Sequence, residues 1–357
     1  MEIKTIVAMS GGVDSSVAAF LLKAQGHDVV GITMRLFLNE NVGIGNERPC
    51  CSLEDISDAG SVSAKMGIPH YVFDFSSDFD KEVIERFVFG YMSGNTPNPC
   101  IDCNRYIKFD RLLNKARAFD FDNIATGHYA VIQKNTGGRH LLRKGADETK
   151  DQSYVLYSLT QEQMQQVIFP LGSLKKSEVR QIALNEGLIN ARKRDSQDIC
   201  FVRNGSYADF IEKYSGVNSE EGDFLDLNGR VIGRHCGHIR YTIGQHKKLG
   251  SAASHNSLSV CSKDIKKNTI TLGNEKDLYS RTIYVNDINM IALSEISSPM
   301  RLKAKIRYKQ SEQWAIAEQV DVSRIRIDFD EPQRAPAKGQ AAVLYDGDIV
   351  VGGGTIE

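Results

Sequence analysis

Two cysteines lie three positions apart in the stretch TPNPCIDCNRYIKF, residues 96–109. Thiols at this spacing can form half of a zinc site, a redox couple, or one reactive thiol beside an inert one. The pattern that follows predicts a helix starting near Cys103, whose thiolate would then be favoured by helix amides and by the nearby Arg105 and Lys108. This argument makes Cys103 a candidate nucleophile and assigns no role to Cys100.

Further cysteines bear on the same chemistry. Cys50 and Cys51 could join the first pair in a zinc site, but adjacent residues fit one tetrahedral ion poorly. Cys200 follows the basic run ARKRD and ends an apolar stretch, so it is either a buried strand residue or a second working thiol. The seven cysteines are odd in number and scattered, which indicates cytosolic thiols rather than a disulfide scaffold.

The string SGGVDSS, residues 10–16, offers a second chemistry. It follows an apolar run and precedes a helical pattern, and Gly11 and Gly12 permit a tight turn. The N–H groups at the start of a helix favour an anion, and the three serine hydroxyls are expected to add donors. The string lacks both the GK[ST] ending of a Walker A loop and the GxGxxG spacing. We interpret it as a phosphate-binding turn; the alternative is a capped helix with structural glycines.

The elements that position these residues alternate between strand and helix up to about residue 200. Residues 3–9 and 28–37 have the pattern of buried strands on either side of a helix that Gly26 ends, which indicates a parallel sheet. From about residue 205, short alternating runs separated by glycines indicate antiparallel β structure. We therefore expect an α/β fold with a doubly wound, Rossmann-like sheet in residues 1–207 and two small β domains in 208–278 and 279–357.

Composition limits the function further. The 357 residues exceed one typical core, and the net charge of −1 means that any nucleic-acid surface is a local patch. No apolar run approaches the roughly 20 residues that span a bilayer, and the N-terminal residues lack the layout of a signal peptide. We expect a cytoplasmic protein without a membrane partner.

One basic patch is visible in the stretch MRLKAKIRYKQ. Basic residues occupy every second position, at Arg301, Lys303, Lys305, Arg307 and Lys309. On a strand they share one face at a spacing of roughly 7 Å, near that of successive phosphates, and the residues between them, Tyr308 included, face a core. The alternative is a solvated edge protected by basic residues.

Five strings resemble, in order and spacing, those of the tRNA-specific 2-thiouridylases of the PP-loop ATP pyrophosphatase superfamily: SGGVDSS, TPNPCIDCNRYIKF, ATGHYA, KDQSYVLYSL and DICFV. The resemblance spans nearly the whole chain. It implies ATP-dependent transfer of sulfur to C2 of the wobble uridine in the tRNAs for Lys, Glu and Gln. It also implies Mg²⁺, a cysteine-desulfurase relay as sulfur donor, and a C-terminal β-barrel that binds tRNA.

The resemblance implies roles for single residues as well. Cys103 would be the nucleophile, Cys200 would carry a persulfide, and Asp14 would act through Mg²⁺. ATP would be held by Ala8, Met9, Ser10, Gly11, Gly12, Val13, Asp14 and Ser15, with Met34 and Gly127 on the adenine and ribose side. The tRNA would be contacted by Asn98, Pro99, Cys100, His128, Lys150, Asp151, Gln152, Arg307, Tyr308 and Gln340. Cys100 departs from the family pattern, which has Asp at this position.

Such a reaction requires two thiols. Adenylation of the C2 oxygen makes it a good leaving group, and a persulfide on one cysteine then supplies the sulfur. The second cysteine attacks the S–S bond, which leaves a disulfide between Cys103 and Cys200 that a reductant must reopen. The target base must also be unstacked. Arg307 and Tyr308 would point apart on a flat strand, so their joint role requires a bulge or a strand end.

Three other functions stay open. A PP-loop synthetase acting on a small molecule would need the ATP turn but neither Cys103 nor Cys200. An iron–sulfur tRNA thiolase would use Cys100, Cys103 and a third thiol as ligands. The last alternative is an RNA-binding protein with a vestigial ATP site.

Overall fold

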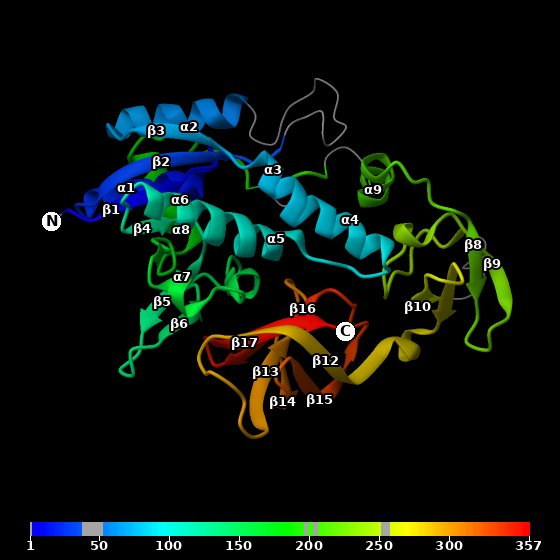
Figure 1. The fold of residues 1–357 in the computed structure, drawn as a ribbon. Helices are drawn as coiled ribbons and strands as arrows, with labels where there is room; N and C mark the ends of the chain where they lie inside the picture. The colour runs from blue at the N-terminus through cyan, green and yellow to red at the C-terminus, as the bar shows by residue number, and fades with distance from the viewer. Residues whose placement is uncertain (1, 38–52, 196–198, 203–205, 251–257) are drawn as a thin grey trace.

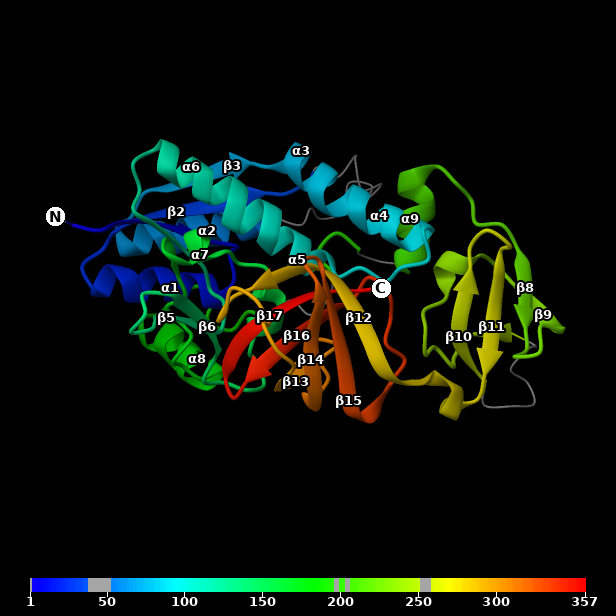
Figure 2. The same cartoon turned by 60° about the horizontal axis from the view of Figure 1, so that its bottom comes forward.

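The computed structural model describes residues 2–37, 53–195, 199–202, 206–250 and 258–357, and the fold is reported for these residues. They form three sheets, arranged as a parallel sheet with its helices, a barrel beside it and a small sheet at the far end (Figures 1 and 2). Within the described ranges, no helix is long and apolar enough to cross a membrane.

The first sheet is parallel, with strand order β3-β2-β1-β4-β7. Its strands are β1 (Lys4–Ala8), β2 (Asp28–Arg35), β3 (His70–Asp74), β4 (Asn123–Ala125) and β7 (Val167–Ile168). Along β1, Ile6 and Ala8 pack in one core, whereas Val7 and the following Met9 pack in another. The sheet is therefore buried on both faces, as in doubly wound folds.

Helices cover each face. The core of Val7 and Met9 is shared with α1 (Val13–Ala24), α2 (Leu53–Met66) and α8 (Lys176–Asn185). On the other face lie two long helical segments, α3 (Ser76–Phe79), η1 (Asp80–Ile84) and α4 (Glu85–Met92), then α5 (Pro99–Asp102), η2 (Cys103–Arg111) and α6 (Leu112–Ala118). The η1 and η2 turns are π-helical. The short η3 (Ser153–Leu156) and α7 (Gln161–Met164) complete this unit.

The middle of the chain forms a small sheet. It is preceded by α9 (Tyr207–Ser215), which packs back on α4 through a contact between the rings of Tyr91 and Tyr207. The strand order is β10-β11-β8-β9, and the bounds are β8 (Gly222–Leu225), β9 (Val231–His235), β10 (Ser259–Asp264) and β11 (Thr269–Gly273). The helical turns η4 (His238–Arg240) and η6 (Glu275–Leu278) accompany it.

The last part of the chain closes into a barrel of order β12-β15-β14-β13-β16-β17, because β12 also pairs with β17. Its strands are β12 (Tyr279–Met290), β13 (Met300–Lys305), β14 (Gln313–Asp321), β15 (Arg324–Arg334), β16 (Ala341–Asp346) and β17 (Ile349–Ile356). The predicted fold class is thus confirmed: a doubly wound parallel sheet followed by two small β units, the last of them a barrel.

One hairpin links the first unit to the barrel. The strands β5 (Ala130–Lys134) and β6 (His140–Lys144) follow β4 in the chain, and β6 pairs with β17 of the barrel. These residues lie within the predicted first domain, 1–207, and the sequence pattern predicts neither the hairpin nor its link to the barrel. The two units therefore share a continuous sheet.

Candidate active site

The SGGVDSS string lies where the strand order of the first sheet reverses. Because β1 lies between β2 and β4, the loops after β1 and β4 meet at the carboxyl edge, where such folds bind ligands. Gly127 lies in the loop after β4, and a Cβ built on it would be 2.8 Å from backbone atoms of Asp14 and Ser15. The loop after β4 is therefore in direct contact with the start of α1. Met34 is half-buried near the end of β2, on the adjacent strand.

The turn itself depends on glycine. Gly11 has φ +72°, in the left-handed region, and a Cβ there would lie 2.3 Å from the carbonyl oxygen of Asp55. Gly12 is the N-cap of α1, and no side chain of the described residues caps this helix end. The first amide groups of α1 are thus left to bind an anion, in agreement with the interpretation of this string.

The serine hydroxyls have a different role from the expected one. Ser15 Oγ and Ser16 Oγ both donate to the carbonyl oxygen of Gly12, at 3.1 Å and 3.0 Å. Ser16 Oγ also accepts from the side-chain amide of Asn190, at 2.9 Å. The expectation that these two hydroxyls add donors for a ligand is wrong, because both are buried and stabilise the turn.

Asp14 has partners that the sequence does not indicate. Lys176 Nζ lies 2.7 Å from both carboxylate oxygens, and the Tyr129 hydroxyl donates to Oδ1 at 2.7 Å. Lys176 is buried, and its ammonium also lies 2.9 Å from Asp195. The lysine thus joins two carboxylates beside the start of α1.

The Asp195 carboxylate is surrounded by three basic side chains. Lys150 and Arg180 each approach its carboxylate to 2.8 Å. Burial raises the pKa of Asp195, but hydrogen bonds from Lys150 and Lys176 outweigh burial and lower the pKa to about 2. Asp195 is therefore ionised at neutral pH and balances three cations. Lys193, in the same basic run, instead pairs with Asp55 and Asp58 of α2.

The helix that carries Cys103 begins at Pro99 rather than at Cys103. Asn98 is its N-cap and accepts from the backbone N–H of Cys100 at 3.1 Å, with Pro99 in the first helical position. Cys103 lies in the second turn, where backbone amides already have helical partners. The predicted stabilisation of its thiolate by the helix N-terminus is therefore wrong.

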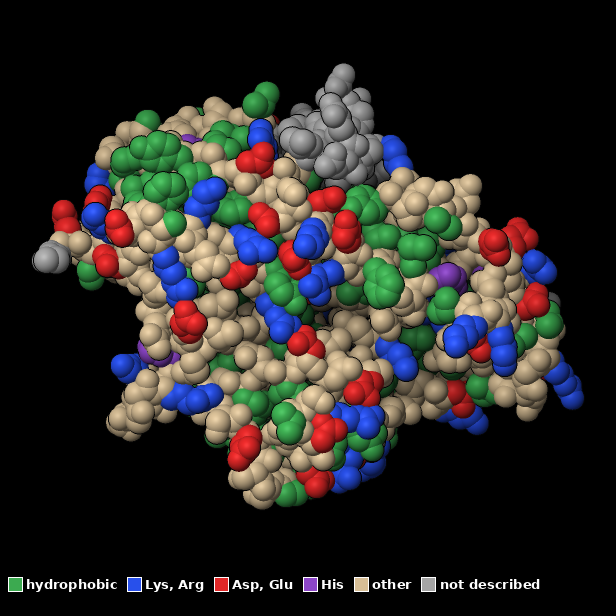
Figure 3. Space-filling model, in the orientation of Figure 1, with side chains coloured by type: hydrophobic (Ala, Val, Ile, Leu, Met, Phe, Trp, Pro, Cys, Tyr) green, Lys and Arg blue, Asp and Glu red, His purple; other side chains and the backbone are tan. Residues whose placement is uncertain are grey.

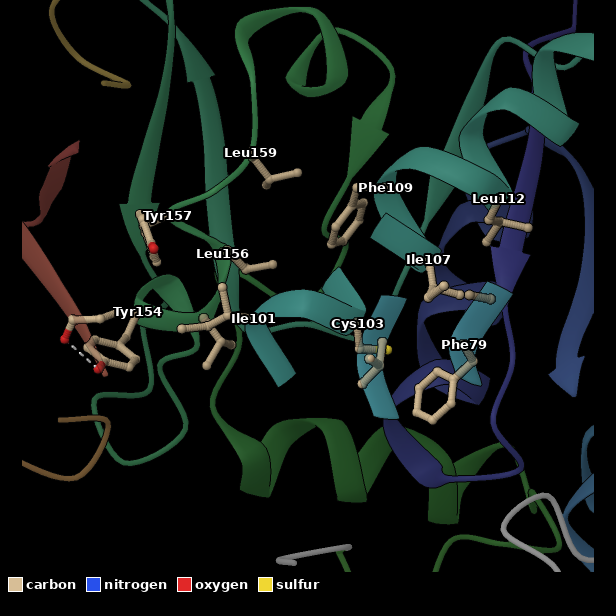
Figure 4. Packing of buried hydrophobic residues seen from close by; sticks show 14 of the residues in the cluster. Phe79, Ile101, Cys103, Ile107, Phe109, Leu112, Tyr154, Leu156, Tyr157 and Leu159 are labelled. Atoms are coloured by element: carbon tan, nitrogen blue, oxygen red, sulfur yellow. Dashed lines mark hydrogen bonds between the residues drawn. The ribbon is translucent and has the colours of Figure 1, made fainter. Parts of the chain in front are cut away.

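Cys103 is a core residue in its packing. Its side chain is 8% exposed and lies among the buried hydrophobic residues around Phe79 and Ile107 (Figure 4). Both expected cationic neighbours also have other partners. Arg105 forms a bidentate ion pair with Asp287 of the barrel. The charge of Lys108 lowers the pKa of Cys100.

Cys100 is the more accessible thiol of the pair. Desolvation by the surrounding protein nevertheless raises the pKa of its thiol, and the charge of Lys108 only partly offsets this effect. A thiol with a raised pKa is a weaker nucleophile at neutral pH. The distinction between the two cysteines is therefore one of surroundings: Cys100 is accessible and Cys103 is buried.

Cys200 lies in a short turn, not in a strand, and its side chain is exposed. The next residue, Phe201, is buried and packs edge-on against Phe79 and Phe87, with ring centroids 5.9 Å and 5.2 Å apart. Cys103 and Phe201 belong to the same hydrophobic core. The segment that carries Cys200 is thus anchored in the core that holds Cys103.

The other metal and cysteine hypotheses gain no support from the geometry. Cys50 and Cys51 lie outside the described residues. Among the residues that are described, no three His, Cys, Asp or Glu side chains are grouped as metal ligands.

Two of the residues expected to contact tRNA join distant parts of the chain, and Figure 3 shows a hollow in the surface between the first unit and the barrel. Gln340 donates to the carbonyl oxygen of Thr96, just before the helix that carries Cys100 and Cys103, called the cysteine helix below. The Tyr308 hydroxyl donates to the carbonyl oxygen of Asp151 at 3.3 Å, and Cys100 raises the pKa of Tyr308, after the larger effect of burial. These contacts place the two residues beside the cysteine helix.

Several of these side chains point inward, however. The His128 ring is buried between Phe109 and Phe169, and burial lowers its pKa well below the usual value. Asp151 accepts from two backbone amides and the Ser153 hydroxyl, and Gln152 accepts from the backbone of Tyr129. The structure places the His128 ring in the core instead of on a surface that RNA can reach.

The basic strand ends earlier than its alternation predicts. β13 stops at Lys305, so Arg307 and Tyr308 lie in a turn. Tyr308 is 37% exposed, and the prediction that it faces a core is wrong. Beyond the strand end the two side chains have different partners: Arg307 donates to the carbonyl oxygen of Ala335, and Tyr308 donates to that of Asp151. Leu302, Ala304 and Ile306 do fill the barrel interior, as the pattern predicts.

Comparison with known proteins agrees with these motifs. Three family models match consecutive segments: a tRNA methyl transferase HUP domain (residues 3–204), a tRNA methyl transferase PRC-barrel domain (208–274) and an aminomethyltransferase beta-barrel domain (280–356). The chain is 47% identical to the tRNA-specific 2-thiouridylase MnmA of Clostridioides difficile (strain 630), covering 100% of this chain and 99% of the relative. It is 46% identical to the corresponding protein of Acetivibrio thermocellus, covering 99% of each chain.

Proposed function

The chain belongs to the tRNA-specific 2-thiouridylases, and we propose that it adenylates its tRNA substrate at the SGGVDSS turn and thiolates it with Cys103 and Cys200. As a member of this family it is a tRNA-uridine 2-sulfurtransferase that uses ATP. The residues that carry out each step, the metal ion, the sulfur donor and the tRNA species are the subject of the proposal.

The observation that carries the proposal is the contact between the loop after β4 and the start of α1. The uncapped start of α1 faces the carboxyl edge, and Gly127 brings the loop after β4 against Asp14. We assign ATP binding to residues 8–15, with its phosphates at the amide groups of α1 and its nucleoside beside Met34 and Gly127. Helix N-termini bind phosphate in this way in many nucleotide-binding folds.

Asp14 fits a role in holding Mg²⁺. Carboxylate oxygens are donors that Mg²⁺ prefers, and the ion usually takes one or two of them together with substrate phosphates. When bound, Mg²⁺ would neutralise charge that develops on the phosphates. Lys176, which touches Asp14 and Asp195, is placed to bind phosphate oxygens when Asp14 turns to the ion.

The sulfur transfer requires the two cysteines in sequence. The terminal sulfur of a persulfide on Cys200 attacks C2 of the adenylated uridine, and AMP leaves. The Cys103 thiolate then attacks Sγ of Cys200, which releases the 2-thiouridine and leaves a Cys103–Cys200 disulfide. A thiol reductant reopens the disulfide. The exposed position of Cys200 suits loading by a persulfide-carrying protein of a cysteine-desulfurase relay.

We further propose that the substrates are the tRNAs for Lys, Glu and Gln, held in the cleft between the first unit and the barrel. Asn98, Pro99 and Cys100 would lie at the flipped wobble base, with Tyr308 and Gln340 on the barrel side. Lys150, Asp151 and Gln152 would position the wall of this cleft. The proposed domain bounds are residues 1–207 for the ATP-binding unit, 208–278 for the small central β domain and 279–357 for the barrel.

Pyrophosphate release from ATP tests this assignment. We expect release by the full-length chain to depend on an unmodified substrate tRNA, and Asp14→Asn to reduce it by at least tenfold. ATP–pyrophosphate exchange that proceeds without RNA would instead support a synthetase acting on a small molecule. An absorbance band at roughly 400 nm in anaerobically purified protein would support an iron–sulfur thiolase.

A further inference from the structure

Trp314 is the only tryptophan of the chain, and 48% of its side chain is exposed. In β14, Ala315 and Ala317 fill the barrel interior, so Trp314 and Ile316 point outward. Tryptophan combines a large apolar ring with a polar N–H group and is enriched at binding interfaces.

Two cations flank this ring. Lys303 of β13 lies directly opposite Trp314 in the strand register, and its ammonium is 5.2 Å from the ring centroid. The guanidinium carbon of Arg301 is 5.3 Å from the same ring, and Asp330 holds Arg301 through both carboxylate oxygens. An aromatic face with adjacent cations suits a nucleobase and its phosphates.

The same strand leads back to the proposed cleft. Lys305 is two residues beyond Lys303 on the same face of β13, at a spacing of roughly 7 Å. Its ammonium is 5.8 Å from the rings of both Tyr154 and Tyr308. A strand of RNA whose target base lies near Tyr308 therefore reaches Trp314 within a few nucleotides.

A protein partner fits this surface less well. Interface cores are depleted of lysine, and here Lys303 lies directly opposite the exposed aromatic ring of β14. The neighbouring Ile316 is 43% exposed, but Asp328 and Arg326 on β15 interrupt the apolar area. The charge next to the ring favours a polyanion.

We propose that Trp314 is a stacking platform for an unpaired nucleotide of the tRNA anticodon loop, with Lys303 and Arg301 binding the adjacent phosphates. This subsite deepens the proposed function, because it rests on tRNA lying in the cleft. It makes the outer face of β13 and β14 an extension of the substrate site.

The tryptophan itself provides the test, since its fluorescence reports on this position alone. We expect an anticodon stem–loop RNA to quench the emission of the full-length protein, and a duplex of the same stem without unpaired nucleotides to leave it unchanged. Equal quenching by the duplex would overturn the proposal in favour of phosphate binding only. Quenching that depends on protein concentration without RNA would overturn it in favour of a second copy of the chain.

Variants provide an independent measurement. Trp314→Leu should weaken tRNA binding by about tenfold or more, and Trp314→Phe should retain most of the affinity, because base stacking needs an aromatic face. Ile316→Ala, at the next outward position of the same strand, is the control and should bind like the wild type. Wild-type affinity of Trp314→Leu would refute the platform, whereas failure of the wild type itself to thiolate tRNA would refute the proposed function instead.

Discussion

The close packing of Gly127 against α1 is the most specific single-residue feature of the ATP turn. A methyl group at this position would lie 2.8 Å from backbone atoms of Asp14 and Ser15, which cannot move without shifting the start of the helix. We expect Gly127→Ala to reduce the free energy of unfolding by about 1–3 kcal/mol and to raise the KM for ATP. Denaturant unfolding and steady-state kinetics measure the two effects.

Gly60 is the matched control for this substitution. It lies within α2, and a Cβ there would have its nearest neighbour, His70 Nδ1, at 3.7 Å. Gly60→Ala should therefore raise the free energy of unfolding by about 0.5–1 kcal/mol, since alanine is the better helix former. If both variants behave alike, the close contact at Gly127 has no role in the turn.

Asp102, between the two cysteines, makes stability depend on pH. Burial raises its pKa to about 7, although Arg86 and Arg105 oppose the shift. The folded protein keeps a proton that the unfolded chain loses near pH 4, so this carboxyl lowers stability as pH rises from about 4 to about 7. Asp102→Asn should therefore melt at a higher temperature than the wild type at pH 8 and at a similar temperature near pH 4. A difference that is equal at both pH values would indicate altered packing instead.

At the scale of elements, only part of the cysteine helix is predictable from the sequence. The apolar spacing of residues 106–119 predicts a helix correctly, but it does not predict the start at Pro99, although Asn98 and Pro99 carry an N-cap signal. The π-helical turns of η2 shift the phase of the side chains, and a period of 3.6 residues does not describe them.

Pairings between distant elements lie beyond such patterns. Lys176 and Asp14 are 162 positions apart, and only the packing of α8 beside α1 brings them together. The turn after β13 is a similar case, because alternation in the sequence continues to Lys309 whereas the strand ends at Lys305. The strings that carry chemistry were recognisable, but their partners and the limits of their elements required tertiary structure.

The β5–β6 hairpin is attached to the barrel by Arg139. Its guanidinium donates to the carbonyl oxygens of Ile291 (2.6 Å), Met290 (3.2 Å) and Leu293. Arg139→Ala would leave these carbonyl groups without their charged donor, and we expect it to reduce the free energy of unfolding by about 2–3 kcal/mol. Equilibrium unfolding in denaturant is the appropriate measurement.

Arg143 on the same hairpin offers the comparison. It pairs with Asp348 near the surface at 2.8 Å, and such pairs contribute about 0–1 kcal/mol. Arg143→Ala should thus be nearly neutral. Losses of equal size in the two variants would contradict a special role for Arg139 in holding the hairpin to the barrel.

For the whole molecule, these links join the ATP-binding unit and the barrel into one body. The shared sheet through β6 and β17 and the ion pair between Arg105 and Asp287 both cross between the units. The proposed tRNA cleft therefore has walls whose relative position is determined by the fold. The order of a doubly wound sheet and two small β units was predictable from sequence, whereas this connection between them was not.

The incorporation of sulfur into tRNA by three cysteine variants tests the central claim most directly. The full-length wild type and the variants Cys103→Ala, Cys200→Ala and Cys100→Ala would be compared with ATP, a sulfur donor and substrate tRNA. We predict that Cys103→Ala and Cys200→Ala each abolish thiolation, whereas Cys100→Ala retains substantial activity. An equal loss in Cys100→Ala would contradict the two-thiol account and point to a metal cluster or a redox role for the CxxC pair.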